Sequence, residues 1–219
     1  VQDKNRNMIN EAFRIIRTKI EFIVGKNAKS PVIMITSANP GSGKTFITIN
    51  LATSFAIKGK KVLAIDMDMR KASLSEYVYS PKTGLSHFLN NSITDIHDII
   101  IKGKTHPNLD ILPVGVLPPN PTELLMEEQL GTMLAMLRNE YDYIFIDCPP
   151  VEIVADTAII TRLVDATLFV VRAEVLERSM LPEIEQFYTE HKYKNMSLIL
   201  NGTSNSNGRY GYRYGYNYG

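Results

Sequence analysis

The chain has 219 residues and a formal net charge of +1, which gives no electrostatic reason to expect binding to nucleic acid or to an anionic membrane. Hydrophobic residues make up 44% and charged residues 21%, so one globular domain with at most a short appendage is expected. The single cysteine excludes an intrachain disulfide and suits a reducing cytosol, and no apolar run approaches the roughly 20 residues of a membrane span.

The first half of the chain opens with an amphipathic pattern and then alternates between strands and helices. Residues 4–24 carry apolar side chains at helical spacing, with no signal-peptide-like apolar region before them. Apolar runs at 32–38 and 61–68 predict buried strands, and the pattern between them predicts a helix over 44–59 with Gly59 as its C-cap. The polar stretch 71–107 carries weaker signals, which predict short helices near 73–79, 84–90 and 93–102.

The second half continues the alternation. Asn120 and Pro121 have the residue types of a helix start, as N-cap and first helical residue. We expect strands at 109–115, 141–150, 166–174 and 196–202, and helices at 120–141, 153–164 and 180–192. Almost wholly apolar strands that alternate with helices indicate a parallel sheet covered on both faces. The predicted fold is therefore an α/β fold with a mostly parallel central sheet and helices on both faces.

Residues 207–219, NGRYGYRYGYNYG, carry a tyrosine at every second position and no pattern of a packed element. These tyrosines are Tyr210, Tyr212, Tyr214, Tyr216 and Tyr218. Taken alone, the stretch is equally well interpreted as an adhesive disordered tail. We expect a globular domain over 1–201, followed by a flexible tail over 202–219.

The strongest functional signal is ANPGSGKT, residues 38–45, which follows a predicted strand and opens a predicted helix, as a P-loop does. Glycines let the backbone bend around phosphates, and the helix N-terminus adds positive potential. Lys44 is predicted to reach the β- and γ-phosphates, and the Thr45 hydroxyl to bind Mg²⁺. Ala38 stands where the motif usually has its first glycine. The predicted ATP/ADP site comprises Pro40, Gly41, Ser42, Gly43, Lys44, Thr45 and Phe46.

Three aspartates follow two of the predicted strands. Asp66 and Asp68 end the strand at 61–68, and Asp147 ends the strand in YIFIDCPP. Ligands of open parallel sheets bind beyond the carboxyl ends of the strands, so these carboxylates are expected near the P-loop. Each one taken singly is as consistent with a helix cap or a turn.

The expected division of labour follows from the chemistry of Mg²⁺, which takes few carboxylates and keeps several waters. Thr45 with Asp68 and Asp147 then serves the metal, and Asp66 accepts the proton of a tyrosine phenol during phosphoryl transfer. The roles of the three carboxylates are interchangeable at this level, with Asp66 also a candidate metal ligand.

Together these features resemble the bacterial tyrosine kinase (BY-kinase) family, of the type that controls capsule and exopolysaccharide synthesis. The resemblance covers nearly the whole chain and rests on the P-loop, on VLAIDMDMR (62–70), on YIFIDCPP (143–150) and on the tyrosine tail. It departs from the family at Ala72, where proline is common after the arginine of the acidic motif.

The resemblance implies an ATP- and Mg²⁺-dependent protein-tyrosine kinase that autophosphorylates its tail, mainly between subunits. It further implies protein substrates in polysaccharide synthesis, and a transmembrane activator whose cytoplasmic tail docks on the kinase. The location would be cytoplasmic, at the inner face of the membrane, with no nucleic-acid partner.

Residues 11–17, EAFRIIR, resemble the family's oligomerisation motif, E-x-x-R-x-x-R. Glu11, Arg14 and Arg17 would contact the neighbouring subunit of a closed ring, where one face of each subunit meets a different face of the next. The pattern alone is more typical of a solvated helix face with one weak ion pair, and it is the resemblance that favours the subunit contact.

Two further residues are candidates for nucleotide contact. Asn201, at the end of LILN, would bind the adenine edge, although Asn-Gly is also a turn signal. Arg172 ends the strand LFVVR and is a second candidate.

Two other classes of protein share features of this sequence. An ATPase of the partitioning or Mrp type has the same expected fold, but it usually carries a lysine in the first half of the P-loop, where this chain has Asn39. An inert nucleotide-binding scaffold would not need three acidic residues around a complete P-loop.

Overall fold

The computed structural model describes residues 8–25, 28–126, 128–151 and 156–203. In this part of the chain a seven-stranded sheet has the order β3-β4-β2-β5-β1-β6-β7. The strands are β1 (Val32–Ser37), β2 (Val62–Asp66), β3 (Ile101–His106), β4 (Leu109–Leu112), β5 (Tyr143–Asp147), β6 (Ala166–Arg172) and β7 (Met196–Asn201).

The α-helices are α1 (Met8–Val24), α2 (Lys44–Ile57), α3 (Leu85–Leu89), α4 (Pro121–Met126), α5 (Glu128–Leu137), α6 (Asp156–Ile160) and α7 (Leu181–Thr189). Three 3₁₀ turns complete the description: η1 (Ser75–Val78), η2 (Ile96–Asp98) and η3 (Arg178–Met180). No helix in the described ranges is long and apolar enough to cross a membrane.

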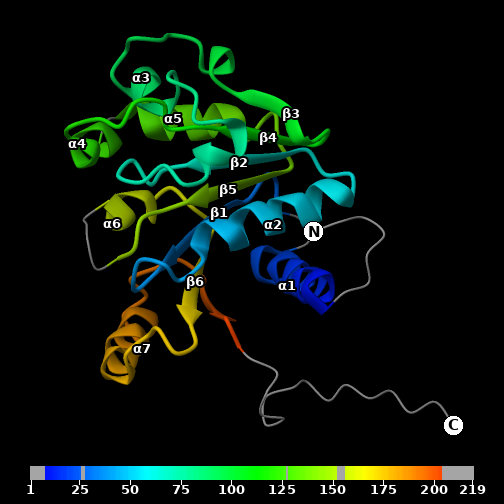
Figure 1. The fold of residues 1–219 in the computed structure, drawn as a ribbon, viewed down its shortest axis with the longest axis vertical. Helices are drawn as coiled ribbons and strands as arrows, with labels where there is room; N and C mark the ends of the chain where they lie inside the picture. The colour runs from blue at the N-terminus through cyan, green and yellow to red at the C-terminus, as the bar shows by residue number, and fades with distance from the viewer. Residues whose placement is uncertain (1–7, 26–27, 127, 152–155, 204–219) are drawn as a thin grey trace, which may run out of the picture.

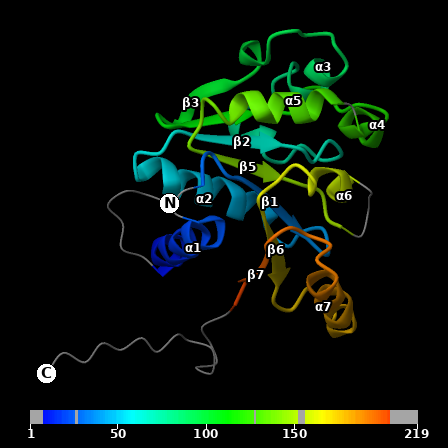
Figure 2. The same cartoon turned by 180° about the vertical axis from the view of Figure 1, so that it is seen from behind.

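All strand pairs are parallel except β3 with β4, which confirms the predicted mostly parallel sheet. The central strands β1 and β2 are buried along their whole length, because helices cover both faces. Helices α1 and α2 pack on one face with Phe13 and Phe55, whereas α3 to α7 cover the other. Helix α2 lies in front of the sheet in Figure 1 and behind it in Figure 2.

The prediction of a helix near 93–102 was wrong. The structure has only the turn η2 there, followed by the edge strand β3 from Ile101, which the sequence did not suggest. Strand β3 is polar and mostly exposed, so it lacks the apolar pattern of the other strands. Strand β3 pairs with the next strand, β4, and its Gly103 amide donates a hydrogen bond of 2.9 Å to the Asp110 carboxylate of that strand.

The topology brings several loops together at one edge of the sheet. Strands β1, β2 and β5 are neighbours and run in the same direction, so the segments that follow them emerge side by side. Those segments are the P-loop after β1, the acidic motif after β2 and the CPP turn after β5. This edge is where the predicted site is to be found.

Candidate active site

The P-loop leaves the buried strand β1 and turns into α2 through two left-handed glycines. Gly41 has φ +75° and Gly43 has φ +91°, values that side-chain-bearing residues rarely adopt. A Cβ atom at Gly43 would also collide with the Asn201 side chain. The loop is closed from inside, because the Ser37 and Ser42 hydroxyls both donate to the Asn39 carbonyl at 2.8 Å. The motif therefore has the local geometry that its glycine spacing predicted.

The departure at Ala38 has a simple structural basis. Ala38 is 1% exposed and packs in the hydrophobic core on the face of α3 to α7. Its backbone is not among the positive-φ residues of the described chain, so glycine is not required there. A methyl group at this position fills core space without changing the loop.

The carboxylates Asp66 and Asp147 lie side by side. They are register partners at the ends of β2 and β5, and both are almost fully buried. The Thr45 hydroxyl donates to Asp147 Oδ2 at 2.6 Å, and Thr48 donates to Asp147 Oδ1 at 3.3 Å. Helix α2 thus ties the P-loop threonine directly to the carboxylate of the second acidic strand, as convergence at the strand ends predicted.

Burial and the charges of neighbouring carboxylates raise the pKa values of this pair. Burial, with the Asp147 charge adding to it, raises the pKa of Asp66 to about 8 from 3.8. Burial also raises the pKa of Asp147 to about 6, against the opposing effect of the Thr45 hydrogen bond and the Lys44 charge. The pKa of Lys44 is lowered by burial, which its neighbours Asp147 and Asp68 oppose. The site is therefore short of positive charge, which a bound metal ion would supply.

The acidic loop after β2 places its two aspartates differently. Both oxygens of Asp66 are occupied within its own loop, since the Ser75 amide and hydroxyl donate to Oδ2 at 2.8 and 2.7 Å and the Asp68 amide donates to Oδ1 at 3.2 Å. Asp68 instead lines the cleft beside the P-loop. The predicted role of Asp66 as base stays a prediction, and of the two aspartates only Asp68 lines the cleft that a nucleotide or an acceptor would enter.

The cleft between the P-loop and the acidic loop has a volume of about 320 Å³. Its walls are Pro40, Gly41, Gly43, Lys44, Thr45, Phe46, Asp68, Lys71, Ser73 and Pro150. Six of these belong to the predicted nucleotide-binding stretch, whereas Lys71, Ser73 and Pro150 were not predicted. The combination of a lysine, a threonine hydroxyl and a carboxylate around a glycine loop suits a nucleotide phosphate with its metal ion.

The carboxylates do not form a metal cage of their own. Among the described residues, no three His, Cys, Asp or Glu side chains are grouped so that they could hold a metal ion. Mg²⁺ in nucleotide sites is usually held by one or two carboxylates together with substrate phosphates. The residues present therefore fit Mg²⁺ that arrives with a nucleotide, with Thr45, Asp147 and Asp68 as its nearest candidate ligands.

Arg172 and Asn201 touch the P-loop rather than the cleft. The Arg172 guanidinium donates to the Gly41 carbonyl at 2.7 Å, and the Asn201 amide donates to the Ser42 carbonyl at 2.9 Å. Strands β6 and β7 end beside one another, with Arg172 and Asn201 in register. Both side chains thus hold the outer side of the loop, and their predicted contact with the nucleotide stays a prediction.

The turn after Asp68 explains the departure from the family at Ala72. Ala72 has φ +52°, a left-handed conformation that proline, fixed near −65°, cannot adopt. The turn is closed by the Ala72 amide, which donates to the Asp68 carbonyl at 2.7 Å. Arg70 attaches this turn to helix α6, because its guanidinium lies 3.5 Å from the buried Asp156 carboxylate. No local pattern in the sequence indicates this ion pair.

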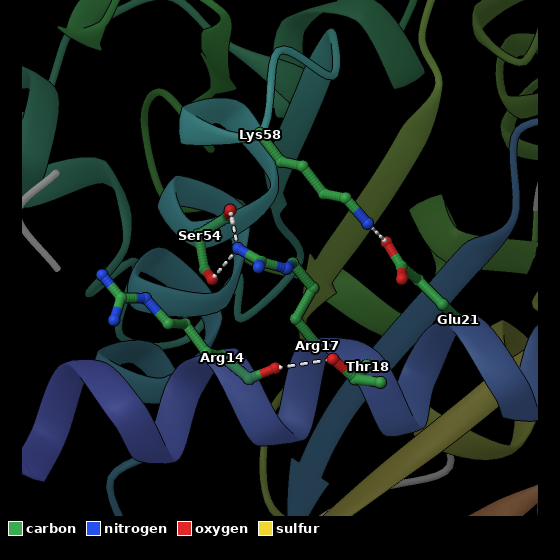
Figure 3. A network of polar contacts seen from close by, with 6 residues as sticks. All are labelled: Arg14, Arg17, Thr18, Glu21, Ser54 and Lys58. Atoms are coloured by element: carbon green, nitrogen blue, oxygen red, sulfur yellow. Dashed lines mark hydrogen bonds and ion pairs between the residues drawn. The ribbon is translucent and has the colours of Figure 1, made fainter.

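Figure 3 shows how α1 packs on α2 through the predicted oligomerisation motif. The Arg17 guanidinium donates to the Ser54 carbonyl at 2.7 Å and to the Ser54 hydroxyl at 3.0 Å. Glu21 pairs with Lys58 at 2.7 Å on the same contact. Arg14 instead forms an exposed ion pair of 3.3 Å with Glu11. Of the three motif residues, therefore, Arg17 attaches α1 to α2 within one subunit, whereas Glu11 and Arg14 pair with each other at the surface.

The tyrosines of the C-terminal stretch, Tyr210 to Tyr218, lie outside the described residues. What the structure gives is the point from which that stretch departs. The last strand, β7, ends at Asn201, in contact with the P-loop, and the described chain continues to Thr203.

Comparison with known proteins places this site in a family. A family model described as an AAA domain matches residues 30–199. CapB of Staphylococcus aureus is 35% identical over 205 residues, covering 92% of this chain and 87% of that protein. The tyrosine-protein kinase CpsD of Streptococcus agalactiae serotype Ia is 36% identical over 203 residues, with coverages of 92% and 85%. Longer relatives occur as well, since the chain spans only 27% of EpsB of Ralstonia solanacearum, at 36% identity over 92% of this chain.

Solved structures agree with this placement. The kinase domain of the Escherichia coli tyrosine kinase ETK has a TM-score of 0.82 at 33% identity, covering 94% of this chain and 80% of that one. The chimerical protein CapA2B2 has a TM-score of 0.80 at 32% identity, with coverages of 90% and 86%. The septum site-determining protein MinD of Pyrococcus horikoshii, complexed with Mg-ADP, has a TM-score of 0.64 at 25% identity, covering 78% and 70%.

The fold and the site thus define a P-loop protein of the NTPase fold with two acidic strand ends. The chain belongs to the family of bacterial protein-tyrosine kinases, as its P-loop, acidic motif and relatives together show.

Proposed function

We propose that this protein is an ATP-dependent tyrosine kinase that phosphorylates its own C-terminal tyrosines, mainly between subunits, and thereby regulates capsule or exopolysaccharide synthesis. Residues 1–201 would form the kinase domain and residues 202–219 the substrate tail. The observation that carries the proposal is the convergence of Lys44, Thr45 and Asp68 on one cleft, with the buried Asp147 hydrogen-bonded to Thr45 behind it. The tyrosine row supplies an acceptor in the same chain.

The residues of the cleft have distinct tasks in this reaction. Lys44 and the backbone amides of the P-loop bind the β- and γ-phosphates, and Thr45 with Asp147 orients the metal ion that accompanies them. A phenol has a pKa of about 10, so it enters the site protonated and needs a proton acceptor as its bond to phosphorus forms. Asp68, which lines the cleft, and Asp66, which lies behind it, are the two candidates for this task.

The decisive experiment is incubation of the chain with ATP and Mg²⁺, followed by mass spectrometry of the tail. We expect phosphate on the tyrosines of residues 210–218 in the wild type and none in Lys44→Met. Hydrolysis of ATP with unmodified tyrosines would contradict the proposal. It would favour an ATPase of the partitioning type, since the structure of MinD has a similar fold.

Transfer between subunits is tested by mixing two variants. One chain carries Lys44→Met and an intact tail, and the other is active but has all five tail tyrosines changed to Phe. Phosphate on the Lys44→Met chain, with an initial rate that rises with the concentration of the active chain, is the expected result. If that chain stays unmodified while the wild type labels itself at the same total concentration, transfer occurs within one subunit.

We further propose that α1 contributes to a ring of subunits through Glu11 and Arg14. Support comes from the exposure of this pair and from the family resemblance of the motif. Because Arg17 is bound to Ser54 of its own subunit, the sharp variant is Glu11→Ala with Arg14→Ala, leaving Arg17 intact. Sedimentation should then show monomers, and rings that persist in this variant would exclude the assignment.

A membrane-bound activator fits the same proposal. The names of the CapA2B2 chimera and of CapB suggest a kinase that works with a second protein, here one that would hold this chain at the inner face of the membrane. Adding the cytoplasmic tail of such a partner should tighten ATP binding. Unchanged affinity and full kinase activity of this chain alone would contradict the dependence.

Phosphorylation is proposed to act as a switch on the assembly. Each phosphotyrosine adds roughly −1.5 to −2 charges, so five add on the order of −8 to −10 to a chain that begins near +1. Such a tail is repelled from a site that already holds phosphates and carboxylates. Changing all five tyrosines to Glu should favour monomers, and stable rings of that variant would count against the switch.

A further inference from the structure

Lys71 faces the active-site cleft from the wall opposite the P-loop. It lines the cleft together with Lys44 and Thr45. Its backbone is fixed by Asp68, whose carboxylate and carbonyl oxygens each accept the Lys71 amide at 3.2 Å. The segment that follows Lys71 is also held in place, since the Asp66 carboxylate accepts hydrogen bonds from the Ser75 amide and hydroxyl. The position of Lys71 is therefore set by the acidic motif itself.

The two basic residues after Asp68 differ in their partners. Arg70 pairs with the buried Asp156 at 3.5 Å, and Thr122 donates to the other Asp156 oxygen at 2.6 Å. For Lys71, by contrast, no carboxylate of the described chain lies within ion-pair distance of its ammonium group. Arg70 thus holds the loop through its ion pair with Asp156, whereas the neighbouring Lys71 lines the cleft.

Two lysines, Lys44 and Lys71, line this space together. Lys44 stands on the P-loop wall, and the charge of Lys71 is close enough to contribute to lowering the pKa of Lys44, after the larger effect of burial. Like charges held across a narrow cleft repel one another unless an anion lies between them. A polyphosphate on the P-loop would place its terminal group in this position.

The P-loop itself has no second cation. Partitioning-type ATPases carry a lysine in the first half of the loop, and this chain has Asn39 there. The Asn39 amide donates to the Met180 sulfur at 3.6 Å, and Asn39 is not among the residues that line the cleft. Phosphoryl transfer benefits from fixed positive charge on the oxygens of the moving group, so a second cation has to come from elsewhere.

We propose that Lys71 is this second phosphate-binding cation, which contacts the terminal phosphate of ATP from the acidic loop. The inference rests on the proposed use of ATP at this site. In the reaction the bond from the γ-phosphorus to the β–γ bridging oxygen breaks and a bond to the phenol oxygen forms. The phenol proton passes to a carboxylate, and Lys71 keeps its proton throughout, acting only through charge and hydrogen bonds.

The proposal predicts that Lys71 distinguishes ATP from ADP, because ADP lacks the group it contacts. Affinities of Mg-AMPPNP and Mg-ADP are measured by competition with a fluorescent ADP, on the full chain without any phosphoacceptor. Lys71→Gln should weaken AMPPNP about tenfold, the effect of losing one charge-assisted hydrogen bond, and should leave ADP within twofold. Lys71→Arg should restore most of the loss. Single-turnover transfer by Lys71→Gln should fall on the order of 10²-fold.

Lys102→Gln is the matched control, since it removes the same charge from the exposed edge strand β3 and should change neither affinity. Equal weakening of AMPPNP and ADP by Lys71→Gln, or no change in either, overturns the proposal. Because no acceptor is present, that outcome leaves the proposed kinase reaction intact. A wild-type chain that binds neither nucleotide would instead overturn both.

Discussion

The buried aspartates of this protein form two groups with different surroundings. Asp110 is almost fully buried, and each of its oxygens has one neutral donor, the Gly103 amide at 2.9 Å and the Tyr141 hydroxyl at 2.9 Å. Asp66 and Asp147 are buried even more completely and lie next to each other as register partners. All three aspartates accept hydrogen bonds on both oxygens, but the strand partner of Asp110 is Leu63, whereas Asp66 and Asp147 are each other's partner. An adjacent pair of buried carboxylates with raised pKa values is costly and is typical of a functional site.

The largest effect expected from this comparison is on catalysis. Asp147→Asn keeps the shape of the side chain but removes the charge that accepts the Thr45 hydroxyl and that is proposed to hold the metal ion. Phosphoryl transfer should fall on the order of 10³-fold. Asp110→Asn, the structural counterpart, should stay within a few-fold of the wild type. Single-turnover labelling of both variants measures the difference, and equal losses would mean that the two groups are not distinct.

The next effect is on the pH dependence of stability without nucleotide. The pKa of Asp66 is raised to about 8, and that of Asp147 to about 6, both mainly by burial, so the folded state binds more protons than the unfolded state. Their contribution is most favourable below pH 4 and is lost as the pH rises toward 8. The free energy of unfolding of the wild type should therefore fall between pH 5 and pH 8, whereas Asp66→Asn lacks the Asp66 contribution to this fall. The difference in free energy of unfolding between Asp66→Asn and the wild type should change by roughly 2–4 kcal/mol in favour of the variant over this range. Urea unfolding at both pH values tests this, and parallel stability curves would contradict it.

A smaller effect is expected on the structural side of the comparison. Tyr141→Phe leaves one oxygen of the buried Asp110 without its donor and should lower the free energy of unfolding by about 1–3 kcal/mol. Kinase activity should be unchanged. Tyr188→Phe, at a tyrosine 61% exposed, is the control and should change stability by less than about 0.5 kcal/mol. Matching denaturation midpoints for the two variants would show that the Asp110 contact contributes nothing.

The smallest expected effect on stability concerns the exposed residues of α1. The Glu11–Arg14 pair is solvated, so changing both residues to Gln should alter the stability of the monomer by only a few tenths of a kcal/mol. Arg17→Gln should cost more, about 1 kcal/mol, because Arg17 binds Ser54 of α2. Thermal unfolding at a concentration where both variants are monomeric separates them. Equal losses would mean that α1 is not attached through Arg17.

The parts of the site that were predictable depend on local patterns and on one topological rule. The P-loop was evident because strand, glycine turn and helix are consecutive in the chain, and Gly41 and Gly43 have the backbone that their type suggests. The approach of Asp147 to the P-loop followed from parallel strands ending at one edge. The fold class followed from apolar strands alternating with helices.

The parts that were missed depend on side-chain contacts that no pattern of residue types indicates. Strand β3 has no apolar alternation, and its place is set by Asp110 and by pairing with β4. The position of Lys71 in the cleft depends on a turn that Asp66 and Asp68 hold together. The attachment of Arg17 to Ser54 spans 37 residues and has no sequence signature, so the motif suggested only a surface role.

The end of β7 sets the length of a tether. Asn201 is hydrogen-bonded to the P-loop, and the described chain ends two residues later at Thr203, so the covalent reach of each tail tyrosine is measured from Thr203. The stretch from Thr203 to Tyr210 spans at most about 25 Å when fully extended, and that to Tyr218 about 50 Å. Local concentration at a neighbouring site depends on whether a tether can reach it. If transfer occurs between subunits as proposed, the covalent length of the chain favours the distal tyrosines as acceptors on a neighbouring subunit, because Tyr210 can lie no more than about 25 Å from Thr203.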